Sequence, residues 1–218
     1  MDRGTLRRAV GSSLIVGLLV VCGCAGPLVT AAYLLKGRNF PAEYDGLKGK
    51  TVAVVCRSQA QLQYSAGAAA NLISQEVSRD LDKNIRSLEL VDPQRVAAWI
   101  DERGWDDFTE VELGDAVKAE MVVSVELEDF SLYEGQTLYK GKSQLRVRVF
   151  DVTEKKVVFE KSSLPVVHPP TTARPVSDKP ENDFRREFVA VIGNRVGRMF
   201  YPYDMYADVA YDSRVLDP

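Results

Sequence analysis

The sequence predicts an α+β domain: a mixed β-sheet of about four to five strands with helices packed on it, as a single domain behind an N-terminal signal or anchor. Short runs rich in β-branched residues alternate with stretches whose apolar residues recur every three to four positions. Two later runs alternate apolar and charged residues, as paired strands do. The 218 residues are 45% hydrophobic and 27% charged, which is the composition of a folded chain.

The N-terminus combines basic residues with a long uncharged run. Arg3, Arg7 and Arg8 precede 27 residues without any charge, Ala9 to Leu35. A positive start followed by an apolar run is typical of a secretory signal or a membrane anchor. The positive end of such a segment stays in the cytoplasm, so we expect the rest of the chain to be exported.

The end of this apolar core resembles a bacterial lipobox, in which a small residue precedes a cysteine. The residues concerned are Val21-Cys22-Gly23-Cys24. The resemblance implies cleavage after Gly23, a diacylglyceryl thioether on Cys24, and acylation of the new amine. Cysteine suits this chemistry because a thiolate is a strong nucleophile. Ala25 follows, where the family's sorting pattern has aspartate for the inner membrane, so the resemblance implies the outer membrane.

Two other interpretations of the N-terminus stay open. The uncharged run exceeds the ~20 residues that span a bilayer, so an uncleaved helix ending near Leu35 is one alternative, although Gly23, Gly26 and Pro27 weaken it. A soluble secreted product is the other, but no clear Ala-x-Ala site follows the apolar core. The expected segments are residues 1–23 as signal, 24–49 as tether, 50–203 as the α+β domain, and 204–218 as a C-terminal tail.

The first half of the exported part predicts two strands and two helices, in alternation. Thr51 to Cys56 is a nearly continuous β-rich run, typical of a strand buried on both faces. Residues 65–84 carry apolar residues about every four positions, which indicates a long helix. Leu88 to Val91 is a second short strand. Asp92-Pro93 then starts a helix, because aspartate caps the first turn and proline needs no N–H acceptor there. A further short helix is expected over residues 114–120.

The second half predicts a meander and a closing helix. Residues 121–128 and 145–149 are predicted to form the two strands of a long hairpin. If the centre of the hairpin lies near Gln136 or Thr137, two glutamates and two arginines share one exposed face. These residues are Glu126 and Glu128 on the first strand and Arg146 and Arg148 on the second. Val157 to Phe159 forms the next strand. Residues 164–180 hold five of the ten prolines, which indicates an extended exposed loop. Glu181 to Phe200 returns to a helical pattern.

This order of elements resembles the small periplasmic domain shared by the LpoB-type penicillin-binding-protein activators, the curli secretion lipoprotein CsgG, and the amino-terminal domain of TolB. The resemblance lies in Lys50 to Cys56, Leu88 to Trp99 and Leu145 to Phe159. It covers about residues 50–200, and most of the matching residues are packing residues. It implies a small α+β domain in the cell envelope. The family's partner-binding residues match no motif of this chain, so none is assigned.

The sequence offers little support for catalysis. The one histidine, His168, precedes two prolines in the predicted loop, and nothing indicates a Ser/His/Asp arrangement around it. No phosphate-binding glycine motif occurs. No set of cysteine and histidine residues has metal-ligand spacing. Cys56 ends a predicted buried strand and is expected to be a packing residue. We therefore expect no enzyme, no cofactor and no metal.

The remaining expectation is a membrane-anchored envelope lipoprotein in the periplasm that serves as a non-catalytic interaction or assembly module. Its partners would be the membrane and an envelope protein; a net charge of −3 argues against nucleic acid. Candidate contacts are the loop around His168 and the aromatic residues Tyr201, Tyr203 and Tyr206. The alternative is an accessory carrier that binds a small apolar ligand between sheet and helices.

Overall fold

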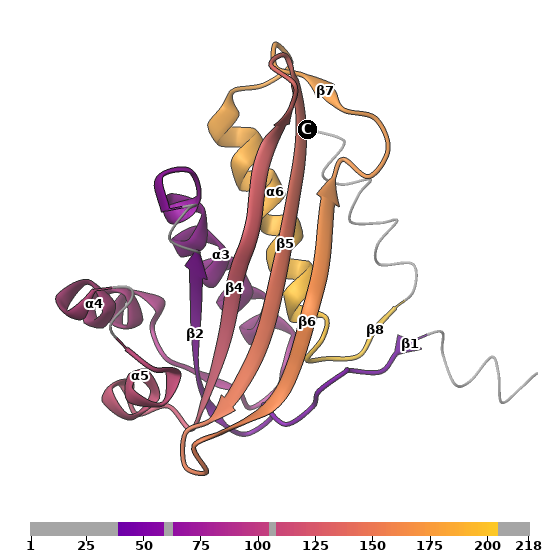
Figure 1. Cartoon of the computed structure of the whole chain (residues 1–218). Coiled ribbons are helices and arrows are strands. Elements are labelled where there is room, and N and C mark those ends of the chain that lie inside the picture. Colours follow the sequence, from indigo (N-terminus) through magenta and orange to yellow (C-terminus); the bar gives the residue numbers. More distant parts are fainter. Residues whose placement is uncertain (1–38, 59–62, 105–107, 205–218) are drawn as a thin grey trace, which may run out of the picture. The chain divides into compact units, whose positions relative to one another are not determined.

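A computed structural model describes residues 39–58, 63–104 and 108–204 (Figure 1). The residues from Phe40 onward form one compact unit. The predicted signal, the candidate lipidation site Cys24 and the candidate contact Tyr206 lie outside the described residues. None of the helices in the described part of the chain has the length and apolar character of a membrane span.

A mixed sheet forms the centre of this unit, with the spatial order β3-β2-β4-β5-β6 and with β7 paired to the start of β5. β2 is parallel to both β3 and β4, whereas β4, β5 and β6 form an antiparallel meander. A separate two-stranded ribbon joins β1 to β8. The strands are β1 Asn39–Phe40, β2 Thr51–Ser58, β3 Glu89–Leu90, β4 Met121–Glu134, β5 Leu138–Asp151, β6 Lys156–His168, β7 Arg174–Pro175 and β8 Tyr203–Asp204.

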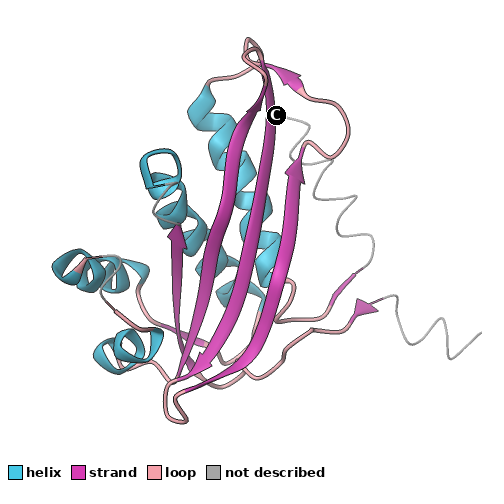
Figure 2. Ribbon diagram, in the orientation of Figure 1, coloured by secondary structure: helices cyan, strands magenta, loops and turns pink. Residues whose placement is uncertain are grey.

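Helices cover the two faces of the sheet unequally. The long helices α3 (Gln63–Asn84) and α6 (Glu181–Gly197) pack over one face and bury the larger part of the core. The short helices α4 (Pro93–Arg103) and α5 (Glu110–Val117) form a smaller core with the opposite face near β2 and β4. Figure 2 shows β4 and β5 extending well past the end of β2. The predicted α+β class with helices on a mixed sheet is confirmed.

Strand β2 is apolar on both faces, because helices cover both faces of the sheet at its position. Val52, Val54 and Cys56 face the larger core, and Ala53 and Val55 face the smaller one; all five are almost completely buried. Because successive strand residues point to opposite faces, a strand between two helical layers needs an uninterrupted apolar run. The predicted two-face burial of this strand is confirmed.

Local sequence signals determine where α4 and α5, the helices of the smaller core, begin and end. The Asp92 side chain accepts a hydrogen bond from the Gln94 N–H at 2.9 Å, with Pro93 in the first turn, as predicted. α5 begins earlier than the predicted residues 114–120, because Thr109 and Glu112 form a capping box. Its C-cap is Lys118, which adopts a left-handed conformation.

The predicted hairpin is confirmed in its register. Tyr133 lies opposite Tyr139, so the turn falls at residues 135–137, and Glu126 lies opposite Arg146. On that face the ion pairs are diagonal, with Arg146 to Glu128 at 2.8 Å and Arg148 to Glu126 at 3.8 Å. These pairs are partly exposed, so each contributes only about 0.2–1 kcal/mol and serves mainly to fix the register.

The predicted exposed loop over residues 164–180 is wrong in its first part. β6 continues to His168, with Leu164 and Val166 buried against the core. β6 is the last strand in the spatial order of the sheet. Proline is tolerated on an edge strand, because half of the strand's backbone N–H groups point away from the sheet and donate no hydrogen bond to a neighbouring strand. Pro165 therefore fits opposite Gln144 without ending the strand.

The domain also begins earlier than Lys50. Leu47 is fully buried, and the Tyr44 N–H donates to the Met199 carbonyl at 3.0 Å. Part of the segment predicted as a tether is thus packed into the domain.

Two glycines allow α6 to lie close to its neighbours. A Cβ on Gly141 of β5 would lie 2.5 Å from the Phe188 ring, and a Cβ on Gly193 would lie 2.7 Å from the Cβ of Glu76 on α3. Both contacts are closer than side chains permit, so these positions need glycine for close approach. The layer between the sheet, α3 and α6 is consequently tightly filled.

Candidate functional site

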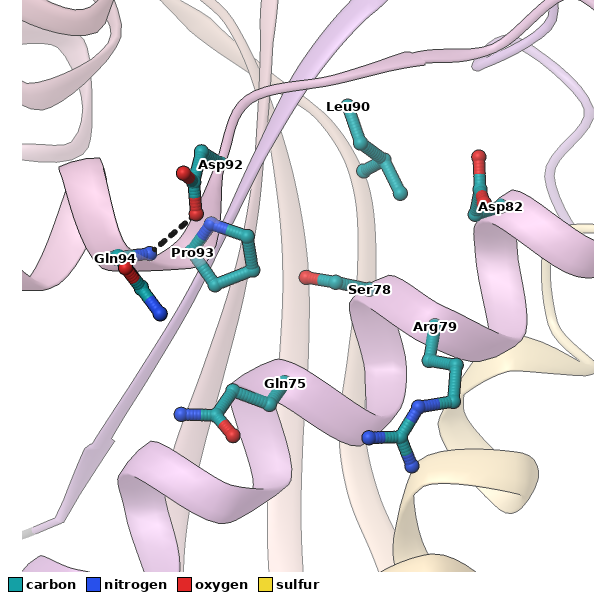
Figure 3. Close-up of a pocket in the computed structure, with 8 residues that line it drawn as sticks. All are labelled: Gln75, Ser78, Arg79, Asp82, Leu90, Asp92, Pro93 and Gln94. Atoms are coloured by element: carbon teal, nitrogen blue, oxygen red, sulfur yellow. Dashed lines mark hydrogen bonds between the residues drawn. The ribbon is translucent and has the colours of Figure 1, made fainter.

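A groove of about 510 Å³ lies between α3 and the start of α4 (Figure 3). α3 forms one wall, the end of β3 contributes Leu90, and the first turn of α4 forms the opposite wall. The lining residues are Gln75, Ser78, Arg79, Asp82, Leu90, Asp92, Pro93 and Gln94.

The sequence builds this groove through the brevity of β3. The strand has only two residues, and Asp92-Pro93 starts α4 immediately after it. Across the groove, Gln75, Ser78, Arg79 and Asp82 recur at helical spacing and therefore share one side of α3. This side adjoins the apolar stripe that α3 buries in the larger core.

Several polar groups of the groove are already used within the fold. Ser78 Oγ donates to the Ser74 carbonyl at 2.8 Å, and Arg79 Nη1 donates to Glu76 Oε1 at 2.5 Å. The Asp92 carboxylate caps α4. These contacts hold the walls of the groove, and the Arg79 guanidinium and the Asp92 carboxylate keep further donors and acceptors.

The side-chain amides of Gln75 and Gln94 differ from these groups. Both residues are exposed, and neither amide makes a hydrogen bond with any described part of the chain. In Figure 3 the two amides extend from opposite walls. Each amide can both donate and accept a hydrogen bond, and so can a backbone peptide group, which makes the two complementary. With Leu90 and Pro93 as apolar contacts, the groove suits an extended peptide segment.

The prediction that His168 is an exposed loop residue is wrong. It ends β6 and is only 1% exposed. Its Nε2 lies 2.7 Å from Glu187 Oε1, and Glu187 also pairs with Arg174 at 3.4 Å and with Lys179. The strand alternation of Leu164, Val166 and His168 is the signal that places the histidine on the buried face.

Glu187 holds this group together electrostatically. Burial alone would raise the pKa of its carboxyl group, but the hydrogen bonds from His168 and Lys179 outweigh burial, and its pKa lies below the ordinary value. The carboxylate therefore ties α6 to the end of β6 and to the segment that follows it. This arrangement has a structural role, because His168 offers no surface to a substrate or partner.

The predicted aromatic cluster is not a continuous surface. Tyr201 is 9% exposed, and its hydroxyl donates to Asp80 Oδ2 at 2.6 Å. Burial and the Asp80 carboxylate raise the pKa of Tyr201, and burial raises that of Asp80. Tyr203 is half-buried, with its ring centroid 5.4 Å from that of Phe40. Tyr201 thus belongs to the core, whereas Tyr203 is partly exposed.

The chemistry available to the described residues is limited. Within residues 39–58, 63–104 and 108–204, no group of three or more histidine, cysteine or acidic side chains could hold a metal ion. Cys56 is buried, and burial raises the pKa of its thiol, so the thiolate is disfavoured.

Comparison by sequence finds no matching family model and no matching curated protein. Similar solved structures include the PelC dodecamer from Paraburkholderia phytofirmans, with 12% identity over 73% of this chain and 95% of that chain and a TM-score of 0.41. Lipoprotein GNA1162 from Neisseria meningitidis has 9% identity over 56% and 83%, and a TM-score of 0.39. The LpoB C-terminal domain from Salmonella enterica has 16% identity over 57% and 87%, and a TM-score of 0.39.

LpoB is thus represented among the similar structures, whereas the resemblance to CsgG and TolB stays a prediction. All three TM-scores are below 0.5.

Proposed function

We propose that this chain is a membrane-anchored protein of the bacterial cell envelope whose exported domain is a non-catalytic interaction module. The observation that carries the proposal is the N-terminal sequence: basic residues, the uncharged run Ala9 to Leu35, and Gly23-Cys24 within it. Lipidation of Cys24 would hold the domain on the periplasmic side. Ala25, rather than aspartate, favours the outer membrane over the inner membrane.

The groove between α3 and α4 is the surface that we assign to the partner. Gln75 and Gln94 supply donors and acceptors that the fold leaves unused. The N–H and C=O of a peptide group can bond the acceptor and the donor of such an amide. Leu90 and Pro93 would contact apolar side chains of the same segment. An extended segment of an envelope protein is therefore the partner that this groove fits.

The carrier alternative, with an apolar ligand between sheet and helices, has less support. Ile73, Val77 and Leu81 of α3 are fully buried, as are Phe184 and Phe188 of α6. The close approaches at Gly141 and Gly193 leave no room there for an added methyl group. A ligand would have to displace packed side chains, at a cost of several kcal/mol.

A photo-cross-linking side chain at Gln94 tests the groove. We expect it to join the full chain, in intact cells, to one protein through an extended segment of that protein. The matched control is the same side chain at Gln144, on the outer face of β5, which bonds Ser163 at 2.7 Å and lies outside the groove. Gln75→Ala should weaken the adduct at position 94, because it removes the opposite amide. Equal adducts from positions 94 and 144 would contradict the assignment.

A further inference from the structure

A short strap connects the end of β6 to the start of α6. It comprises residues 169–180 and contains β7, which pairs with the start of β5. Figure 1 shows β7 beside the turn that joins β4 and β5, at the opposite end of the sheet from α5. The strap shares no residue with the groove between α3 and α4.

Backbone bonds and apolar contacts hold this strap only weakly. Four of its residues are prolines, which have no N–H to donate. Its ladder with β5 is two residues long, and the Val176 N–H donates to the Thr137 carbonyl at 3.0 Å. Lys140 adds a hydrogen bond to the Thr171 carbonyl at 3.3 Å. After Pro169 no residue of the strap is buried, and segments with few buried contacts open locally at low cost.

A single carboxylate fastens the strap to α6. Glu187 accepts hydrogen bonds from Arg174 at 3.4 Å and from Lys179. The same carboxylate lies 2.7 Å from Nε2 of His168, at the end of β6. The Glu187 side chain is only 9% exposed, so water competes little with these bonds. None of the three basic side chains pairs with another acid among the described residues.

A neutral Glu187 would reverse the balance of charge at this point. Arg174 and Lys179 would lose the counter-charge that they share, and they would remain close together beside His168. Like charges without a counter-charge repel one another more strongly where water is partly excluded. Opening the strap would carry Arg174 and Lys179 into water, whereas His168 and Glu187 belong to β6 and α6.

The strap covers a strand edge that the rest of the sheet leaves free. β7 pairs with β5 at Leu138 and Tyr139, whereas the pairing of β6 with β5 begins only at Gly141. The Tyr139 ring stacks on Phe184 of α6, with 4.7 Å between centroids. Because α6 supplies this contact, the core beneath does not depend on the strap for its packing.

We propose that the strap is a latched cover: residues 169–180 open as a unit while β6 and α6 stay in place, and a proton on Glu187 shifts the strap toward the open form. The open form exposes the β5 edge at Leu138 and Tyr139 together with the carboxyl group of Glu187. The inference is independent of the partner groove and of the membrane anchor.

Acid is the condition that favours the open form. Burial raises the pKa of Glu187, but hydrogen bonds from His168 and Lys179 outweigh burial and hold its pKa below the ordinary value of 4.5 in the closed form. In the open form the bond from Lys179 is lost and water reaches the carboxyl group, so its pKa returns toward the ordinary value. The charge therefore favours the closed form fully above pH 4.5, and this preference is lost as the pH falls through the closed-form pKa.

Amide hydrogen exchange of the full chain in detergent, resolved by residue, tests the local opening. The Val176 amide reports on the strap, and the amide of the fully buried Val125 in the central strand β4 reports on the core. We expect Val176 to exchange faster than Val125, at a rate that low concentrations of urea leave unchanged, since local opening exposes little surface. Exchange at Val176 that rises with urea in parallel with Val125 would overturn the proposal.

Two variants test the latch at neutral pH. Glu187→Gln should speed exchange at Val176 by at least about tenfold, the factor that corresponds to one hydrogen bond to a charged group. Lys179→Gln leaves the carboxylate in place and removes its bond from the strap, so it should speed the same amide without removing the contact between His168 and Glu187. Unchanged exchange at Val176 in both variants would contradict the latch.

Glu181→Gln is the matched control for Glu187→Gln. Glu181 lies on the same helix, but it bonds Tyr133 and Arg185 rather than the strap. These bonds persist when the strap opens, so the control should leave exchange at Val176 unchanged even if it lowers the stability of the whole fold. Equal effects of the two glutamine variants on Val176 would overturn the proposal.

The dependence on pH completes the test. After correction for the intrinsic exchange rate, protection of Val176 in the original chain should be constant near neutral pH and should fall below pH 4.5, while Val125 stays protected. In Glu187→Gln the protection of Val176 should be low throughout and should not follow this titration. An original chain whose strap is as insensitive to acid as that of Glu187→Gln would contradict the role of the proton.

Discussion

Replacing Phe188 with alanine should lower the free energy of unfolding by about 3–5 kcal/mol, the range for a buried phenylalanine. Phe188 is completely buried on α6, its ring stacks on Phe130 with 5.5 Å between centroids, and it fills the space that Gly141 leaves open on β5. Alanine would leave a cavity between α6 and the sheet that the tightly packed layer could not close. Chemical denaturation of the full chain in detergent, followed by circular dichroism, measures this change.

Phe40→Ala is the matched control, because it makes the same substitution at a partly exposed position. We expect it to cost less than about 1 kcal/mol. Equal losses for the two variants would contradict the description of α6 as the helix that closes the larger core.

Replacing Glu187 with glutamine should lower the free energy of unfolding by about 2–3 kcal/mol at neutral pH, since hydrogen bonds to charged groups contribute about 1.5–3 kcal/mol. His168, Arg174 and Lys179 would lose the one carboxylate that they share. The glutamine keeps the volume, so the loss would come from charge and hydrogen bonding rather than from a cavity.

The pH dependence identifies the carboxylate as the cause. The folded pKa of Glu187 lies below its ordinary value of 4.5, because hydrogen bonds from His168 and Lys179 outweigh the opposing effect of burial. A group with a lowered folded pKa stabilises the fold fully above the unfolded pKa, and this stabilisation is lost as the pH falls through the folded pKa. The difference between the original chain and Glu187→Gln should therefore be constant near neutral pH and should shrink below pH 4.5.

Glu128→Gln is the control for this prediction. Glu128 pairs with Arg146 on the partly exposed outer face of the hairpin, so we expect a loss of at most about 1 kcal/mol. A stability difference for Glu187→Gln that stayed constant down to pH 3 would contradict the role assigned to its charge.

Local and periodic signals were sufficient for most of the fold. The uninterrupted apolar run of β2, the Asp92-Pro93 helix start and the charge alternation of β4 and β5 each depend on neighbours along the chain. The position of β6 at the sheet edge is a property of the whole topology. From the sequence alone, the prolines after Leu164 indicate a loop and therefore an exposed His168, whereas the edge position of β6 accommodates Pro165 and buries the histidine.

The candidate sites were harder to predict for the same reason. The groove depends on how α4 lies against α3, and Gln75 and Gln94 have no local pattern that separates them from ordinary surface residues. Tyr201 lies next to Tyr203 in the sequence, but its hydroxyl donates a hydrogen bond to Asp80, 121 positions away, and the side chain lies in the core. Long-range contacts of this kind follow only from the assembled fold.

Labelled palmitate tests the central claim, that Cys24 anchors the domain to the envelope. The original chain, Cys24→Ala and two controls, Cys22→Ala and Cys56→Ala, would be expressed in a bacterial host and isolated with the membrane fraction. We expect label on the original chain and on both controls, and none on Cys24→Ala, because only Cys24 carries the lipid in the proposed mature form. Label on Cys24→Ala, or its absence from the original chain, would contradict the lipoprotein assignment.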